Sequence, residues 1–343
     1  MHMADALLSP AVGGAMWAAT AASTAYCSRK VREEMDDRKV PLMGVLGAFV
    51  FAAQMINFAI PGTGSSGHLG GGLLLAILLG PHAAFLVMAS VLAVQALFFA
   101  DGGLLALGAN IFNLGVFPCF VAYPLLYRPL AGRDPTPGRI AAAAVLASVI
   151  GLQFGALGVV LQTVLSGISE LRFAPFLALM LPIHLAIGVV EGLVTAAVVT
   201  FVARAQPDIL ARQSAPRARP GASVRSVLLG LGAAALVIGA VVSWFASSHP
   251  DGLEWSIAGV TGSEEVEPPE GGVHESLGRL QEKLSFLPDY GFQSSGEEGE
   301  GEGEPAWPAV DPGTSVSGVV GGVLTLVVAG AAGWVLRRRA RTA

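Results

Sequence analysis

The chain has 343 residues, of which 53% are apolar and only 13% charged, a balance that excludes an ordinary soluble globular protein. The net charge of -5 averages two regions of opposite sign, because 15 acidic residues lie between positions 246 and 315 against only Arg279 and Lys283. Both cysteines, Cys27 and Cys119, lie in apolar stretches, so neither a disulfide framework nor a thiolate metal site is indicated. No nucleic-acid partner is expected.

Apolar stretches along the chain predict a membrane protein of nine segments, since about 20 apolar residues cross a bilayer as a helix. The third stretch is too short to span alone, so we expect it to be broken or re-entrant. The predicted segments are residues 9–27, 41–60, 69–80, 82–99, 104–127, 140–164, 175–202, 224–245 and 316–336.

Basic residues gather in alternate connections, beginning with Arg29, Lys30 and Arg32 after the first segment. Positively charged loops stay in the cytoplasm, so the amino terminus is expected outside. On this topology every basic residue except Arg172, Arg279 and Lys283 faces the cytoplasm. No cationic stretch precedes the first segment, so no cleavable signal peptide is expected and the chain should keep its start.

Three parts are predicted: a transmembrane domain over 1–205, a cytoplasmic basic linker over 206–223, and a module over 224–343. The module has two transmembrane helices around an acidic extracytoplasmic loop at about 246–315. Within the loop, apolar residues at helical spacing predict a short amphipathic helix. They are Val273, Leu277, Leu280, Leu284 and Leu287. The Gly-Glu tract at 294–304 cannot form a core.

The first two residues, Met1 and His2, are a candidate metal chelate. A histidine in second position offers three neighbouring nitrogens: the terminal amine, its own deprotonated amide and its ring Nδ1. Methionine removal generally requires a small second residue, so Met1 should be retained. One further imidazole would complete a planar set of four nitrogens, the geometry that favours Ni²⁺ or Cu²⁺.

His68 is the leading candidate for that fourth nitrogen, because only six histidines occur in the chain. It lies within the glycine-rich run Pro61-Gly62-Thr63-Gly64-Ser65-Ser66-Gly67-His68-Leu69-Gly70-Gly71-Gly72, which can bring backbone and ring close to an ion. The alternative is a chance histidine after the start and an ordinary turn.

Ionisable residues inside membrane segments are costly and point to function. His184 and Glu191 are seven residues apart near one helix face, and their expected roles are a buried pair, a proton relay, an outer coordination shell or a fixed packing contact. Gln54 and Asn57, just before the glycine-rich run, are candidates for orienting His2 or His68.

Two other functions fit parts of the sequence. A stand-alone proton-coupled carrier of divalent metal would use His184 and Glu191 as its relay, although the chain lacks the internal duplication common in such carriers. An intramembrane serine hydrolase would use Ser66 as nucleophile, with His184 or His68 as base, on a short and weak Gly/Ser pattern.

With these residues in view, the chain resembles the CbiM/NikM family, the substrate-binding (S) components of nickel and cobalt energy-coupling factor transporters. The resemblance covers about residues 1–205. It rests on Met1-His2 with Asp5 and Leu8-Ser9-Pro10, on Gly64-Ser65-Ser66-Gly67-His68 with Gly70-Gly71-Gly72, and on His184 with Glu191-Gly192. Met3, Ala4 and Ala6 replace the Ile-Pro and Gly usual there.

The rest of the chain resembles the NikN-type accessory module, so the two components look fused. That likeness rests on Pro250-Asp251-Gly252-Leu253-Glu254 and on Leu287-Pro288-Asp289-Tyr290-Gly291.

The resemblance implies an all-α integral membrane protein, a seven-helix bundle plus two further transmembrane helices, in the cell membrane of a prokaryote. It implies that Met1, His2 and His68 bind Ni²⁺ or Co²⁺ as the transported substrate. The implied partners are a transmembrane coupling component and two cytoplasmic ATPases. No Gly-x-x-x-x-Gly-Lys-Ser/Thr loop occurs in the chain, so it is not expected to be an enzyme itself. Planar nitrogen coordination slightly favours nickel.

Overall fold

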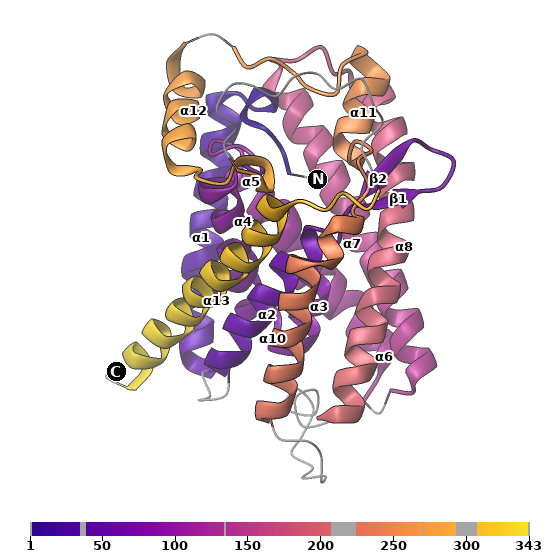
Figure 1. Cartoon of the computed structure of the whole chain (residues 1–343), viewed down its shortest axis with the longest axis vertical. Helices are drawn as coiled ribbons and strands as arrows, with labels where there is room; N and C mark the ends of the chain where they lie inside the picture. The colour runs from indigo at the N-terminus through magenta and orange to yellow at the C-terminus, as the bar shows by residue number, and fades with distance from the viewer. Residues whose placement is uncertain are drawn as a thin grey trace.

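The computed structural model describes residues 2–34, 39–133, 135–206, 224–269, 271–292 and 307–341. These residues are almost entirely helical, with one small hairpin, which confirms the predicted all-α membrane fold (Figure 1). Met1, the linker residues 207–223 and the Gly-Glu tract at 294–304 lie outside the described residues.

The first part of the chain builds the centre of the bundle. A short helix, α3, has eight residues and all of them are buried, in agreement with a third segment too short to span. The elements here are η1 (Asp5–Leu7), α1 (Pro10–Glu34), α2 (Lys39–Gln54), β1 (Phe58–Ile60), β2 (Ser65–Gly67), α3 (Gly72–Leu79) and α4 (Pro81–Phe98).

The prediction of a single helix over 41–60 is wrong at its C-terminal end. α2 stops at Gln54, and the last residues form β1, which pairs antiparallel with β2. Gly62 and Gly64, between the strands, have φ of +77° and +71°, a left-handed conformation that glycine adopts without steric cost. These two residues let the glycine-rich run fold back as a hairpin.

The next elements are α5 (Leu107–Ile111), the π-type helix η2 (Phe112–Tyr127), α6 (Arg128–Ala131), α7 (Pro137–Ser166) and α8 (Phe173–Ala205). Pro118 and Pro124 stand inside η2. Each lacks the N–H that would close an α-helical bond, and widened turns accommodate the missing bonds. The helical segment predicted over 104–127 continues through α6 to Ala131.

The last part contains α10 (Val224–Ala240), η3 (Val242–Phe245), α11 (Gly252–Thr261), α12 (Gly272–Leu284), η4 (Pro288–Tyr290) and α13 (Pro312–Arg341). The segment expected as one helix over 224–245 breaks after Ala240 into the short turn η3. α12 confirms the amphipathic helix predicted from the leucine spacing as far as Leu284, whereas Leu287 lies beyond its end.

The helices of the last part pack directly on the first. α13 lies against α2 and α10, and α7 pairs with α8 along another side. Glycine makes the closest approach possible, because a Cβ on Gly239 of α10 would lie 3.1 Å from the backbone of Gly318 in α13. The two parts therefore form one bundle.

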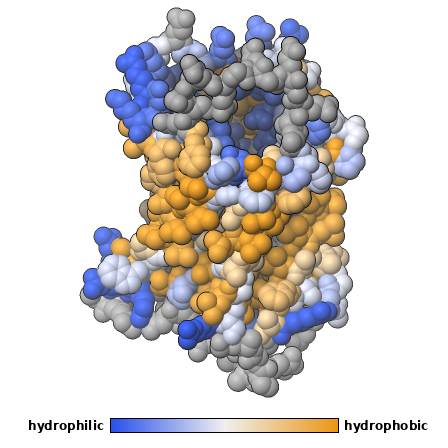
Figure 2. Space-filling model, in the orientation of Figure 1, coloured by the Kyte–Doolittle hydropathy of each residue, from blue (hydrophilic) through white to orange (hydrophobic). Residues whose placement is uncertain are grey.

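Five helices among the described residues are long and apolar enough to cross a membrane. The shorter α2 and α10, of 16 and 17 residues, are also apolar. Figure 2 shows a broad apolar band across the face in view, between two hydrophilic ends. The hairpin, α11 and α12 lie at one of these ends, here called the hairpin end, and the C-terminus lies at the other (Figure 1).

Candidate metal centre

The residues after His2 are anchored deep inside the hairpin end. Met3 is fully buried, its N–H donates to Asn110 Oδ1 at 2.8 Å, and its carbonyl accepts from Asn110 Nδ2 at 3.1 Å and from the N–H of Gly103 at 3.0 Å. Asp5 Oδ1 accepts the N–H of Ala106 at 2.9 Å. The departures from the family pattern at Met3 and Ala4 thus leave a well-packed loop.

His2 sits at the end of this anchored loop with only 8% of its side chain exposed. Its Nδ1 lies 2.7 Å from Oδ1 of Asp101, and Oδ2 of Asp101 accepts a hydrogen bond of 2.5 Å from the hydroxyl of Tyr290. Burial alone would raise the pKa of Asp101, but His2 and Tyr290 hold it well below its usual range. His2 Nε2 is buried without a hydrogen-bond partner among the described residues.

His68 follows β2, and its ring stacks on that of His2, with centroids 4.9 Å apart and planes inclined by 21°. Its Nδ1 lies 3.2 Å from the carbonyl of Leu69. A carbonyl only accepts, so Nδ1 carries the proton and the lone pair is on Nε2. Burial lowers the pKa of His68 to about 3, which leaves the imidazole neutral and able to bind a metal.

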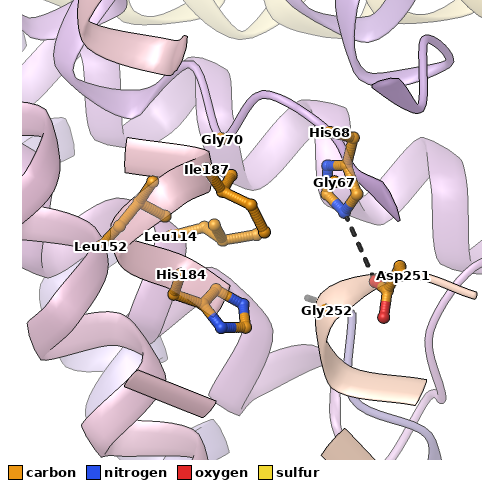
Figure 3. A pocket seen from close by; sticks show the side chains of 9 residues that line it. All are labelled: Gly67, His68, Gly70, Leu114, Leu152, His184, Ile187, Asp251 and Gly252. Atoms are coloured by element: carbon orange, nitrogen blue, oxygen red, sulfur yellow. Dashed lines mark ion pairs between the residues drawn. The ribbon is translucent and has the colours of Figure 1, made fainter. Parts of the chain in front are cut away.

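Asp251, the residue before α11, faces His68 from the second module. Its Oδ2 lies 3.8 Å from His68 Nε2 (Figure 3), while Oδ1 caps α11 by accepting the N–H groups of Leu253 and Glu254 at 2.7 and 2.9 Å. A reciprocal bond from the Asp251 N–H to Glu254 completes a capping box. The sequence of this turn therefore fixes the carboxylate in place.

The turn before α11 is also bonded to the hairpin. The N–H of Ser66 donates to the carbonyl of Pro250 at 2.8 Å, and Ser66 Oγ donates to the carbonyl of His249 at 2.8 Å. Trp255 Nε1 donates to the carbonyl of Thr63 at 3.0 Å. Because Ser66 Oγ is bonded to main-chain carbonyls, its geometry does not resemble that of a catalytic nucleophile activated by histidine.

A small cavity opens below His68, with the ring of His184 on its opposite side (Figure 3). His184 Nδ1 lies 2.8 Å from the carbonyl of Met180, one turn earlier in α8. Glu191, two turns further along, instead accepts the N–H groups of Gly70 and Gly71 at 2.9 and 3.1 Å. His184 and Glu191 are therefore bonded to backbone and do not form the pair that their spacing suggested.

Of the polar residues predicted near the site, Gln54 supports the chain just after His68, donating from Nε2 to the carbonyl of Gly70 at 2.9 Å. Asn57 contributes its carbonyl to the N–H of Ser247 in the second module. Met1 lies outside the described residues.

Sequence reasoning missed Asp101 and Tyr290 as neighbours of His2, and Asn110 as the anchor of Met3. Asp101-Gly102-Gly103 lies between the predicted segments 82–99 and 104–127, and no spacing links such a connection to a residue a hundred positions away. Among the described residues, no three His, Cys, Asp or Glu side chains are gathered closely enough to hold an ion by themselves.

Two family models match the chain. The model described as the cobalt uptake substrate-specific transmembrane region, CbiM, matches residues 2–209, and the PDGLE domain matches residues 225–338.

Relatives with known names span most or all of the chain. A putative fused nickel transport protein NikMN from Archaeoglobus fulgidus is 34% identical and covers 100% of both chains. A fused nickel transport protein NikMN from Rhodobacter capsulatus is 34% identical over 84% of this chain and 88% of its own. A cobalt transport protein CbiM from Sorangium cellulosum is 33% identical over 65% of this chain and 100% of its own.

A solved structure, described as a truncated transition metal transporter, superposes with a TM-score of 0.51 at 31% identity. The match covers 59% of this chain and 98% of that chain.

Proposed function

The chain belongs to the CbiM family and carries a PDGLE domain behind the CbiM region, and from this premise we propose that it is the membrane substrate-binding component of a nickel or cobalt importer. Its relatives, named as nickel and cobalt transport proteins, come from archaea and bacteria. The apolar helices fit a multi-pass protein in a prokaryotic cell membrane.

The observation that carries the proposal is the stacked pair of His2 and His68, buried at the hairpin end. Two imidazoles brought together inside a membrane protein are costly unless they serve a ligand. We propose that the amine of Met1, the amide and ring of His2 and the ring of His68 hold the ion in a plane. Four nitrogens in this geometry favour nickel slightly over cobalt.

Binding in this form requires a rearrangement of the His2 ring. Only Nδ1 can close a chelate ring with the residue's own amide, and in this structure Nδ1 faces Asp101. The ion would draw the His2 Nδ1 away from Asp101. The Asp101 carboxylate would then lie beside the metal and compensate its positive charge. Deprotonation of the amide makes the binding release a proton.

Import would use partners that the chain does not supply. We propose a transmembrane coupling component and two cytoplasmic ATPases, with ATP hydrolysis driving the loaded protein to reorient. In this arrangement the hairpin end faces outward, residues 1–205 form the metal-binding domain, residues 206–223 form a cytoplasmic linker, and residues 224–343 form the accessory module. Positive charge at the C-terminal end of α13, beginning with Arg337, supports this orientation.

The runner-up functions have less support from the geometry. A proton relay between His184 and Glu191 is opposed by their separate bonds to Met180 and to Gly70 and Gly71. A hydrolase based on Ser66 is opposed by the bonds of its hydroxyl to main-chain carbonyls.

The direct test inserts three glutamines between Met1 and His2 in the full-length protein, a large second residue that keeps Met1 in place, and measures Ni²⁺ binding by calorimetry. The insertion separates the terminal amine from the histidine chelate, so affinity should fall by more than about a hundredfold, or about 2.8 kcal/mol. His68→Ala should have a similar effect, whereas His249→Ala, which removes an exposed histidine of the accessory module, should leave affinity unchanged.

Near-normal affinity in the insertion variant would eliminate the terminal chelate. Intact-mass measurement of the purified chain must show a start at an unmodified Met1, since trimming or acylation would remove the amine.

A further inference from the structure

The proposed outer ligands of the ion, Met1, His2 and His68, do not account for His184. This residue is 1% exposed, inside a helix long enough to cross the membrane. Its Nδ1 must donate to the carbonyl of Met180, so the lone pair is on Nε2, and Nε2 has no hydrogen-bond partner among the described residues. A buried polar atom without a partner destabilises a folded protein, and such an atom needs a physical reason.

The orientation of His184 is that of a metal ligand. Metal-binding histidines usually donate the second ring N–H to a carbonyl or carboxylate, which fixes the other nitrogen as the ligand. His68 is arranged in the same way, with Nδ1 on the carbonyl of Leu69. Both rings line one cavity, from opposite sides (Figure 3).

Asp251 adds an oxygen ligand to the same cavity. Zinc-like divalent ions lie about 2.0–2.2 Å from nitrogen and oxygen ligands. The 3.8 Å between Asp251 Oδ2 and His68 Nε2 is therefore wide enough for an ion between the two atoms.

The next residue, Gly252, leaves room for the ring of His184 beside the cavity, because a Cβ there would lie 3.2 Å from Cε1 of His184. A larger residue would press on the ring that faces the cavity.

We propose that Asp251 and His184 form an inner divalent-cation position, which receives the transported ion from His68. This proposal rests on the proposed function. The ion keeps His68 while it exchanges the amine, the amide and the His2 ring for the Asp251 carboxylate and His184 Nε2. The His2 amide nitrogen regains from solvent the proton that it released when the ion bound, so charge and atoms balance over the two steps, and water fills the remaining coordination sites.

The inner position lies further into the bundle. His184 is about 16 Å along α8 from its start at Phe173, at 1.5 Å per residue. Gly70, Leu114 and Leu152 line both this cavity and a second one that reaches Glu191. Among the described residues no three ligand side chains are gathered closely enough to hold an ion as they stand, so His68, Asp251 and His184 must move together to bind it. Binding should therefore be weak, as an intermediate position must be for the ion to leave it.

The test titrates the purified full-length protein first with Ni²⁺ and then with Co²⁺, by calorimetry and by visible absorption of the cobalt. The wild type should show a tight step and a second step at least about a hundredfold weaker, with a cobalt spectrum typical of mixed nitrogen and oxygen ligands. His184→Leu should lose the second step and keep the tight step within about threefold. Asp251→Asn should also lose it, while Asn still caps α11.

Thr195→Val is the matched control, because Thr195 is buried on the same helix but lines neither cavity. A single step in the wild type, or an unchanged second step in His184→Leu, would overturn the inner position. The tight step reports folding in each variant. Its loss when three glutamines are inserted after Met1 tests the outer chelate separately.

Discussion

His2 Nδ1 and Asp101 Oδ1 are 2.7 Å apart, although the two residues stand at opposite ends of the first four helices of the chain. Tyr290 completes the arrangement by donating to the other oxygen of Asp101 at 2.5 Å. The ring of Tyr290 is itself stacked on Phe99, with centroids 5.0 Å apart. The accessory module therefore helps to orient a candidate metal ligand through the carboxylate between them.

Asp101→Asn should weaken nickel binding by about 10- to 100-fold, the usual effect of losing a group that orients a ligand. The substitution removes the charge beside the ion and leaves one acceptor oxygen for two donors, His2 and Tyr290. Calorimetric titration with Ni²⁺ measures the change. Asp289→Asn is the control, because it removes one negative charge from the same turn as Tyr290 without contacting His2. Unchanged or tighter binding in Asp101→Asn would show that the carboxylate only competes for the ring.

Glu191→Gln should destabilise the protein. Its carboxylate accepts two N–H groups beside the His68 turn, and glutamine keeps only one acceptor oxygen. The lost bond to a charged group is worth about 1.5–3 kcal/mol, so thermal unfolding in detergent should begin several degrees lower. Glu170→Gln, at an exposed connection, should leave unfolding unchanged. A Glu191→Gln protein of normal stability that had lost proton uptake would instead favour the proton-coupled carrier.

Stability of the metal-free protein should fall in acid because of His68. Its pKa is about 3 when folded, below the value of 6.5 expected for an exposed histidine. Below pH 6.5 the His68 imidazole is therefore protonated in the unfolded chain but stays neutral in the folded protein. The cost grows by up to about 1.4 kcal/mol per pH unit as the pH falls towards 3, and is absent above 6.5.

The difference in unfolding temperature between the wild type and His68→Gln, followed from pH 7 to pH 4, isolates this effect from other titrating groups. The wild type should lose more stability than the variant across that range. Parallel curves would mean that His68 is solvated when the protein is folded.

Gly102→Ala should disturb the loop that carries His2. Gly102 has a φ of +78°, and an added Cβ would lie 2.9 Å from Asn110 Nδ2 and 3.2 Å from Cβ of His2. Nickel affinity should fall because the methyl group displaces the residue that bears the ligand. Gly62→Ala separates this effect from backbone strain, since Gly62 has a φ of +77° and open space around it. Equal affinity losses in both variants would argue against a contact at His2.

The membrane segments could be read from the sequence because apolar length and basic loops are local signals. The segment 82–99 matches α4 closely, and the short third segment was recognised from its length. The end of α2 could not be placed from the sequence, because a short apolar run such as Phe58–Ile60 is compatible with both a helix and a strand. Pairing with β2 makes it a strand. Past Tyr127, where η2 ends, the helical segment continues as α6 to Ala131, beyond its predicted end.

For the site, the sequence alone indicated His2 and His68, because a histidine in second position has a distinctive chelate chemistry and other histidines are few. Only the tertiary structure brought Asp101, Tyr290 and Asp251 to these rings. Those contacts join residues from distant helices and from both modules, and no local periodicity encodes which carboxylate will face which imidazole. Packing of the whole bundle decides that choice, since the buried rings must find partners within the folded protein.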